Sequence, residues 1–159
     1  EDDVTAMRKL ESSLRVSDLD GSDYDIVFLA GGWGAAYDLG QSPDLGELVT
    51  QANAHGAVIG GVCHGPLGLL QANDTDGNPL VQGRRLTAVS DTQVKQLGIE
   101  FTPLHPETEL RKAGALYESE TAFRDMFATH VVVDGNLITS RTPDDLPAFM
   151  QAVIAALKA

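Results

Sequence analysis

The sequence has 159 residues, of which 43% are hydrophobic and 21% are charged, as is typical of one soluble globular domain with a substantial core. Its formal net charge of −12, from 23 acidic and 11 basic residues, argues against nucleic acid or an anionic membrane surface as a partner. One cysteine cannot form an internal disulfide, and no stretch has the pattern of a signal peptide or a membrane span. We therefore expect a cytoplasmic protein.

The N-terminal part predicts a helix followed by a buried strand. Residues 3–14 carry apolar side chains near helical spacing, which indicates an amphipathic helix. After a polar loop, residues 24–30 form a nearly continuous apolar run, which is typical of a central strand in a parallel sheet. The apolar helix positions, which we expect to contact the core, are Val4, Met7, Leu10 and Leu14.

A glycine-rich turn, Gly31-Gly32-Trp33-Gly34, follows this strand. In open α/β sheets, ligands bind beyond the carboxyl ends of the strands. The glycines allow backbone N–H groups to face a substrate oxygen, as an oxyanion hole requires, and a plain tight turn is the alternative. Trp33 is expected either to line the pocket or to pack in the core.

The single cysteine lies between a second strand and a helix. Residues 57–62 are apolar and predict a buried strand, and Pro66 is a typical first helical residue. Cys63 at this bend is a candidate nucleophile on a strained elbow, where a helix N-terminus would lower the thiol pKa by at most about 1.5 units. Burial as a small hydrophobic residue is the alternative. Small residues surround it at Gly60, Gly61 and Gly65.

The rest of the chain alternates short helices, strands and turns. A final helix is expected to be capped by Asp144 or Asp145 and to bury Leu146, Phe149, Met150, Val153, Ile154 and Leu157. The other predicted elements are a helix over 45–54, a turn-rich loop over 73–78, a strand over 86–89, a helix from a capping box at 90–93 to about 97, a helix over 106–113, and a hairpin of 131–134 with 136–139 around Asp134-Gly135.

Three segments resemble, in their order along the chain, the motifs of the ThiJ/PfpI superfamily. The segment 62–66 is similar to its Cys-His-Gly-Pro elbow, 23–34 to its strand ending in Gly-Gly-x-Gly, and 132–140 to its late hairpin. The resemblance implies an α/β three-layer sandwich with a mostly parallel central sheet, of the class I glutamine amidotransferase-like (flavodoxin-like) type. It implies that residues 1–159 form a single ThiJ/PfpI-type domain that corresponds to the C-terminal portion of the family's domain.

The resemblance also implies a site and an activity. Cys63 would be the nucleophile, His64 the general base or acid, and Asp91 the orienting carboxylate, although a helix-capping role explains Asp91 almost as well. His105 and Glu107 mimic the His-x-Glu pair of glutamine amidotransferases, so His105 either lines the site or caps a loop. The glyoxalase III branch converts methylglyoxal or a similar 2-oxoaldehyde to a 2-hydroxy acid without glutathione. No cofactor or metal is implied, and protein deglycation is a related activity.

Family members begin with a strand, a helix and a strand that have no counterpart here, and a Glu that hydrogen-bonds the Cys lies in that region. We therefore expect an N-terminal segment of the same protein to complete the sheet and supply this Glu, and we expect a homodimer. Either His64 or that Glu would shuttle the proton. Other functions compatible with the elbow are a non-catalytic redox-sensing or holdase chaperone protein, and a cysteine peptidase or amidase.

Overall fold

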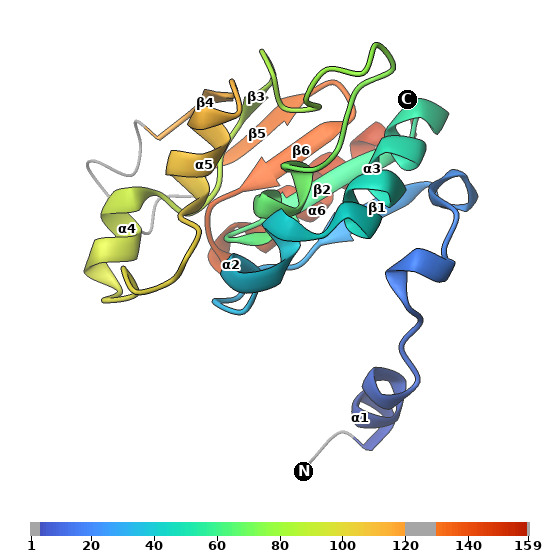
Figure 1. Ribbon diagram of the computed structural model, residues 1–159, viewed down its shortest axis with the longest axis horizontal. Coiled ribbons are helices and arrows are strands. Elements are labelled where there is room, and N and C mark those ends of the chain that lie inside the picture. The colour runs from blue at the N-terminus through green and yellow to red at the C-terminus, as the bar shows by residue number, and fades with distance from the viewer. Residues whose placement is uncertain (1–3, 120–129, 159) are drawn as a thin grey trace.

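The computed structural model describes residues 4–119 and 130–158. A four-stranded sheet has the strand order β1-β2-β6-β5 and lies between layers of helices (Figure 1). The strands β1 (Ile26–Leu29), β2 (Val58–Val62) and β6 (Leu137–Ser140) run parallel, and β5 (Val131–Asp134) is antiparallel to β6. The predicted three-layer α/β fold with a mostly parallel sheet is confirmed.

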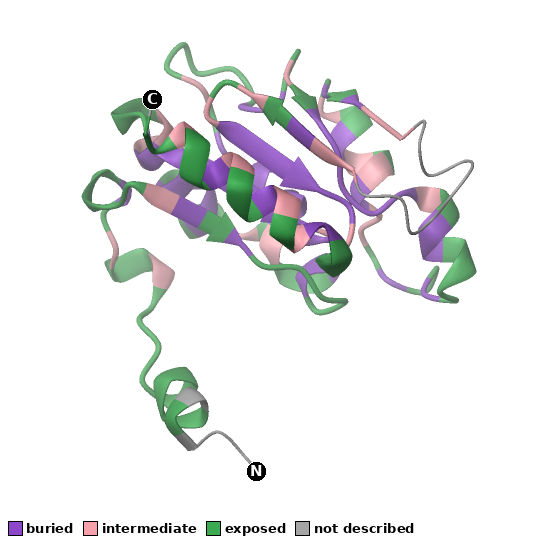
Figure 2. Cartoon of the chain, turned by 180° about the vertical axis from the view of Figure 1, so that it is seen from behind, coloured by how far each residue is buried: buried purple, intermediate pink, exposed green. Residues whose placement is uncertain are grey.

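Each face of the sheet has its own core. On one face, helix α3 (Pro43–His55) and the 3₁₀ helix Gly65–Leu69 cover inward-facing side chains of the strands. On the other face, α6 (Leu146–Ala156) packs Phe149 and Val153 against the sheet, and Figure 2 shows this helix lying across the strands. Strand side chains alternate between the faces, so Val27, Leu29 and Ile59 belong to the first core, and Val58, Val62 and Ile138 to the second.

The remaining elements surround the carboxyl ends of the parallel strands and the far side of β5. The capping box predicted at Ser90 is present, with Gln93 completing it, and the hairpin turn at Gly135 is confirmed. No helix in the described ranges has the length and apolar character needed to cross a membrane. The elements around the carboxyl ends of the parallel strands and beside β5 are α2 (Ala35–Asp38), α4 (Asp91–Gln96), α5 (Pro106–Lys112), and the pair β3 (Arg85–Leu86) and β4 (Leu116–Tyr117).

The first strand lies at the edge of the sheet in the part of the chain described, and a central position in the complete protein stays a prediction. β1 pairs with β2 alone. Phe28 points to the α6 face, where it contacts Phe149 with ring centroids 5.6 Å apart, yet it is 47% exposed. An apolar run therefore identified a strand but not its position, because neighbours in a sheet are supplied by distant segments.

Two helices bury less than their sequences predict. α1 (Val4–Glu11) stands apart from the sheet (Figure 1), and Met7, Leu10 and Leu14 are exposed, so their predicted core contacts are wrong. In α6 only Phe149 and Val153 are buried, whereas three predicted core residues are 45% to 48% exposed. Those three are Met150, Ile154 and Leu157. Asp145 is buried at the N-cap position of α6, but its side chain makes no capping hydrogen bond to that helix. Its carboxylate accepts instead from the backbone N–H groups of Arg141 and Thr142, at the start of the preceding 3₁₀ turn.

Close packing of α3 against the chain after Leu69 depends on Gly46. A Cβ at this position would lie 2.4 Å from the carbonyl oxygen of Gln71. We expect Gly46→Ala to lower the free energy of unfolding by about 1–3 kcal/mol through overpacking, although alanine is favoured over glycine inside a helix by about 1 kcal/mol. Urea denaturation measures this. Gly34→Ala, whose Cβ meets nothing within 4 Å, serves as the control, and equal stability of both variants would contradict the packing argument.

Candidate active site

Cys63 follows β2 directly in a strained backbone conformation. Its φ is +61°, and it is the one residue other than glycine with a positive φ in the described part of the chain. Its backbone N–H donates to the Ser140 carbonyl oxygen at 3.0 Å, and its own carbonyl oxygen accepts from Val89 N–H at 3.1 Å. Two hydrogen bonds to different segments therefore hold the peptide in a conformation that a β-carbon disfavours. This is the backbone geometry of a nucleophile elbow.

Neighbouring glycines allow the elbow to approach the end of β1. A Cβ on Gly31 would lie 2.6 Å from the Val62 carbonyl oxygen and 2.7 Å from the Cys63 Cβ. A Cβ on Gly65 would lie 2.0 Å from the Leu29 carbonyl oxygen. Glycine is thus required at positions 31 and 65 because a β-carbon there would lie too close to neighbouring atoms. At position 32 it is required because the φ of +110° disfavours any residue with a β-carbon.

The pKa of Cys63 is shifted in the direction opposite to the one expected from the sequence. Burial raises the thiol pKa, and the backbone N–H groups of Gly32 and His64 offset this only in part. The expected helix dipole is weak because the segment after the elbow, Gly65–Leu69, is a five-residue 3₁₀ helix rather than an α-helix. Burial therefore favours the protonated form of the resting thiol.

His64 places one imidazole nitrogen beside the sulfur. The side chain is fully buried, and its Nδ1 lies 3.4 Å from Cys63 Sγ. Burial lowers the pKa of His64, and the positive charge of a protonated His105 would lower it further. Both shifts favour a neutral thiol beside a neutral imidazole, which is able to take the thiol proton when a substrate arrives. The other nitrogen, Nε2, is buried without a hydrogen-bond partner among the described residues.

An open, mostly apolar cavity of about 480 Å³ lies beside Cys63. Gly31, Gly32 and Trp33, from the turn after β1, are among the residues that line it. Trp33 is 53% exposed, so it lies on the cavity wall rather than in the core. The full lining consists of Phe28, Ala30, Gly31, Gly32, Trp33, Val62, Cys63, Leu97, Pro143 and Leu146.

Asp91 lies at the start of α4 and interacts with α5. Its Oδ2 accepts from the Thr108 hydroxyl at 2.7 Å, and its backbone N–H donates to Glu107 Oε2 at 3.0 Å. Ser90, not Asp91, is the N-cap. Oδ1 of Asp91 is buried without a hydrogen-bond partner in the part of the chain described, and no hydrogen bond there connects it to His64. An orienting role for Asp91 therefore stays a prediction.

His105 is near the site but not part of the cavity lining. It precedes α5, and its Nε2 lies 3.2 Å from the Glu100 carbonyl oxygen. Its positive charge, when the ring is protonated, lowers the pKa of His64. Its geometry fits the loop-bracing alternative that the sequence left open.

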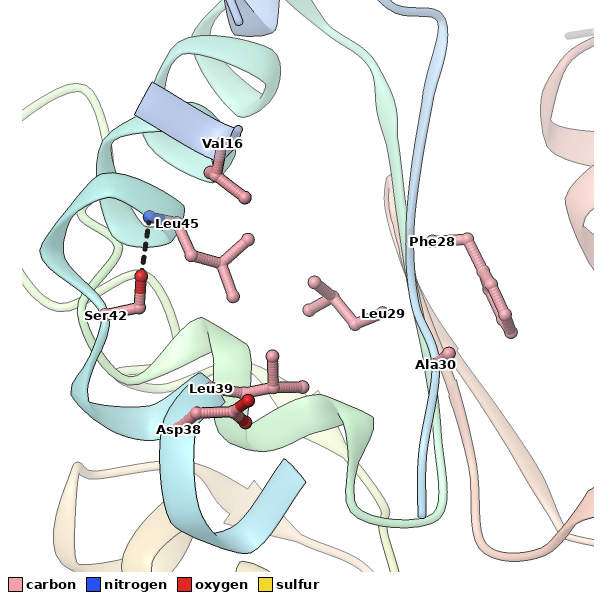
Figure 3. Close-up of a pocket in the computed structure, with 8 residues that line it drawn as sticks. All are labelled: Val16, Phe28, Leu29, Ala30, Asp38, Leu39, Ser42 and Leu45. Carbon is pink, nitrogen blue, oxygen red and sulfur yellow. Dashed lines mark hydrogen bonds between the residues drawn. The ribbon is translucent and has the colours of Figure 1, made fainter. Parts of the chain in front are cut away.

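A second hollow, of about 360 Å³, lies on the other side of β1 (Figure 3). Leu29 and Leu45 point into it, whereas Phe28 projects from the opposite face of the strand. Asp38 is the one ionisable residue of its lining, and the Ser42 hydroxyl there accepts a hydrogen bond from the Leu45 N–H at the start of α3. No group of three potential metal ligands occurs within residues 4–119 and 130–158. The chemistry-bearing cavity is therefore the one beside Cys63.

Sequence reasoning missed six residues of the cavity wall: Phe28, Ala30, Val62, Leu97, Pro143 and Leu146. Phe28 and Leu146 belonged to apolar patterns that predicted core positions, and Leu97 ends α4. Pro143 offered a usable signal, because it follows β6, which is parallel to β2. Carboxyl ends of parallel strands meet at one edge of a sheet, so the residues after β6 return beside Cys63.

The shifted thiol pKa gives a direct test, because Cys63 is the one cysteine of the sequence. We expect the rate of alkylation by iodoacetamide to rise with pH through a midpoint above that of the same chain unfolded in urea, since burial raises the pKa of the thiol. The unfolded chain should titrate near the ordinary value of about 8.5. A native midpoint below the unfolded one would contradict this description, and Cys63→Ser should abolish labelling in both states.

Known proteins resemble this chain in sequence and in fold. The sequence matches the profile of the DJ-1/PfpI family over residues 4–156. Glyoxalase 3 of Candida albicans is 30% identical over 160 residues, which cover 94% of this chain and 64% of that protein. The putative cysteine protease YraA of Bacillus subtilis is also 30% identical, over 157 residues that cover 94% of this chain and 71% of that protein.

A solved structure shows the same likeness in three dimensions. Rapid Encystment Protein 24 kDa of Francisella tularensis superposes with a TM-score of 0.87 at 26% identity, covering 98% of this chain and 68% of that one. The chain thus spans about two thirds of the length of the proteins that it resembles. On its matched residues, motifs and fold, the chain belongs to the DJ-1/PfpI family.

Proposed function

We propose that the protein is a cysteine-dependent, glutathione-independent glyoxalase that converts a 2-oxoaldehyde to a 2-hydroxy acid. The observation that carries the proposal is a strained cysteine with an imidazole nitrogen 3.4 Å from its sulfur, at the edge of an apolar cavity. The relative named glyoxalase 3 supports this reaction class. A thiol that adds to an aldehyde requires this combination of nucleophile, adjacent base and open space.

In the first step the Cys63 thiol adds to the aldehyde carbon. His64 Nδ1 takes the thiol proton, the sulfur–carbon bond forms, and the carbonyl π electrons move to the oxygen. The backbone N–H of Gly32, which already donates toward the sulfur, would stabilise the negative oxygen. The imidazolium then returns the proton to this oxygen and gives a hemithioacetal.

In the second step a proton moves between the two substrate carbons. Removal of the C1 proton by His64 gives an enediolate. The C1 hydroxyl proton passes to the C2 oxygen, and the imidazolium returns its proton to C2, which gives the thioester of a 2-hydroxy acid. C1 is oxidised and C2 is reduced, so no external oxidant is needed. Water then attacks the thioester carbon, the carbon–sulfur bond breaks, and the sulfur regains its proton. Asp91 would orient the imidazole, and repair of glycated proteins would use the same thiol.

We also propose that the complete protein is a homodimer and that a preceding segment pairs with β1. In the described residues β1 has one strand neighbour, and the outer edge of a parallel strand is usually covered. An acidic side chain from that segment near Cys63 would assist proton transfer. The whole protein's activity is tested best on the longest natural form of the chain.

A cysteine peptidase is the second candidate, because one relative of 30% identity is named a putative cysteine protease. The same thiol and imidazole would form an acyl-enzyme with a peptide. Hydrolysis of fluorescently labelled casein, abolished by Cys63→Ser, would favour this activity. Its absence alongside methylglyoxal turnover would favour the glyoxalase.

The glyoxalase proposal predicts that methylglyoxal consumption depends on both residues of the pair. We expect Cys63→Ala to reduce the rate to that without enzyme, and His64→Asn to reduce kcat by about 10²- to 10⁴-fold, the range typical of a lost acid–base catalyst. Production of lactate provides the measurement. His55→Asn, at the exposed end of α3, is the matched control and should retain full activity. A Cys63→Ala variant that retains turnover would refute the mechanism.

A further inference from the structure

The wall of the cavity beside Cys63 is unusually uniform in chemistry. Its side chains other than the thiol are apolar, and no Lys, Arg, Asp, Glu or His within the described ranges lines it. The polar groups of the lining residues are those of the backbone, including the N–H of Gly32, together with the sulfur and the indole N–H of Trp33. The reacting carbonyl therefore finds polar partners at the elbow, whereas the rest of a substrate meets hydrocarbon.

The volume exceeds what the smallest 2-oxoaldehydes can fill. A cavity of about 480 Å³ falls within the range of about 300–1,000 Å³ that is typical of sites for larger organic ligands. Methylglyoxal has a single methyl group beyond the reacting carbons, so it would leave most of the wall in contact with water. A larger apolar substituent would remove that wall from water and gain binding free energy from the area buried.

Two half-exposed side chains form the part of the wall that a substituent would cover. Trp33 comes from the turn after β1 and is 53% exposed, and Leu97 comes from the end of α4 and is 47% exposed. They belong to segments far apart in the sequence yet line one cavity with Cys63. An indole face also favours stacking with an aromatic ring.

The charge of the protein also favours an uncharged substrate. The sequence has a formal net charge of −12, and the described cavity lining has no basic side chain to pair with an anion. A substrate with a carboxylate or phosphate would lose hydration there without gaining a partner. The cavity therefore disfavours anionic substrates.

From these observations we infer that the site is specific for uncharged 2-oxoaldehydes with an aryl or branched alkyl substituent, and that Trp33 and Leu97 are specificity-determining residues. This inference rests on the proposed glyoxalase activity. The substituent would lie against Trp33 and Leu97 while the aldehyde carbon faces Cys63 Sγ.

Competing substrates test the inference on the full chain. We expect kcat/KM for phenylglyoxal to exceed that for methylglyoxal by at least about tenfold, since even one methylene in an apolar pocket changes it by about 10- to 200-fold. 4-Carboxyphenylglyoxal has the same ring with a negative charge and should be turned over at least about tenfold more slowly than phenylglyoxal. Initial rates are measured from the hydroxy acid product by chromatography, before these reagents have time to modify arginine side chains.

The outcomes distinguish the inferred substrate specificity from the proposed glyoxalase reaction. A phenylglyoxal rate equal to or below that of methylglyoxal, or no discrimination against the carboxylate, would overturn the inferred specificity and leave the proposed reaction standing. Absence of turnover for all three substrates would overturn the glyoxalase proposal itself.

A matched pair of leucine variants tests the assigned residues. We expect Leu97→Ala to lower the ratio of kcat/KM for phenylglyoxal to that for methylglyoxal by about threefold to tenfold, because part of the contact area is lost. Trp33→Ala should lower the same ratio. Leu116→Ala, at a leucine that is 57% exposed on β4 and outside the cavity, should leave the ratio unchanged. An unchanged ratio in both cavity variants would contradict their assignment.

Discussion

The backbone of Cys63 is the constraint on which the rest of the site depends. A positive φ costs a residue with a β-carbon about 1–2 kcal/mol, so neighbouring segments must hold it. The Ser140 carbonyl oxygen at the end of β6 and the Val89 N–H before α4 provide these bonds. The same segments continue into Pro143 and Leu97, which form the cavity wall. Strain at the elbow and the shape of the cavity therefore have a common origin.

The electrostatics of the site follow from burial rather than from charge. Desolvation raises the pKa of the thiol and lowers the pKa of the adjacent imidazole, so each group favours its neutral form. With Cys63 Sγ and His64 Nδ1 3.4 Å apart and both groups favouring the neutral form, the resting site favours a thiol over a thiolate. Under the proposed mechanism, proton transfer to His64 would accompany attack on the carbonyl, at the stage when the N–H of Gly32 would stabilise the new negative charge.

The sheet brings these groups together because three of its strands end at one edge. β1, β2 and β6 are parallel, and their carboxyl ends are followed by the Gly31-Gly32 turn, by Cys63, and by the segment that leads to Leu146. On the α6 face, Phe28 and Phe149 pack beneath the cavity, while Gly60 leaves room for the Phe149 ring. The site is thus supported by the same core that attaches α6 to the sheet.

Short-range features were readable in the sequence because neighbours in the chain decide them. The elbow at Cys63, the capping box at Ser90 and the hairpin turn at Gly135 each depend on a few consecutive residues, and each is present. From these motifs the nucleophile, its neighbouring imidazole and the glycine turn were predicted together, and the cavity includes Cys63 and that turn.

Burial could not be read in this way, because it depends on which distant segments pack together. Apolar patterns correctly identified β1 and α6 as strand and helix, yet Phe28 and Met150 are about half exposed. For the same reason the sign of the thiol pKa shift and the cavity position of Leu97 emerged only from the tertiary structure. The sequence by itself determined where the one thiol lies and the local backbone that holds it, whereas packing decided the solvation of that thiol and the shape of the cavity beside it.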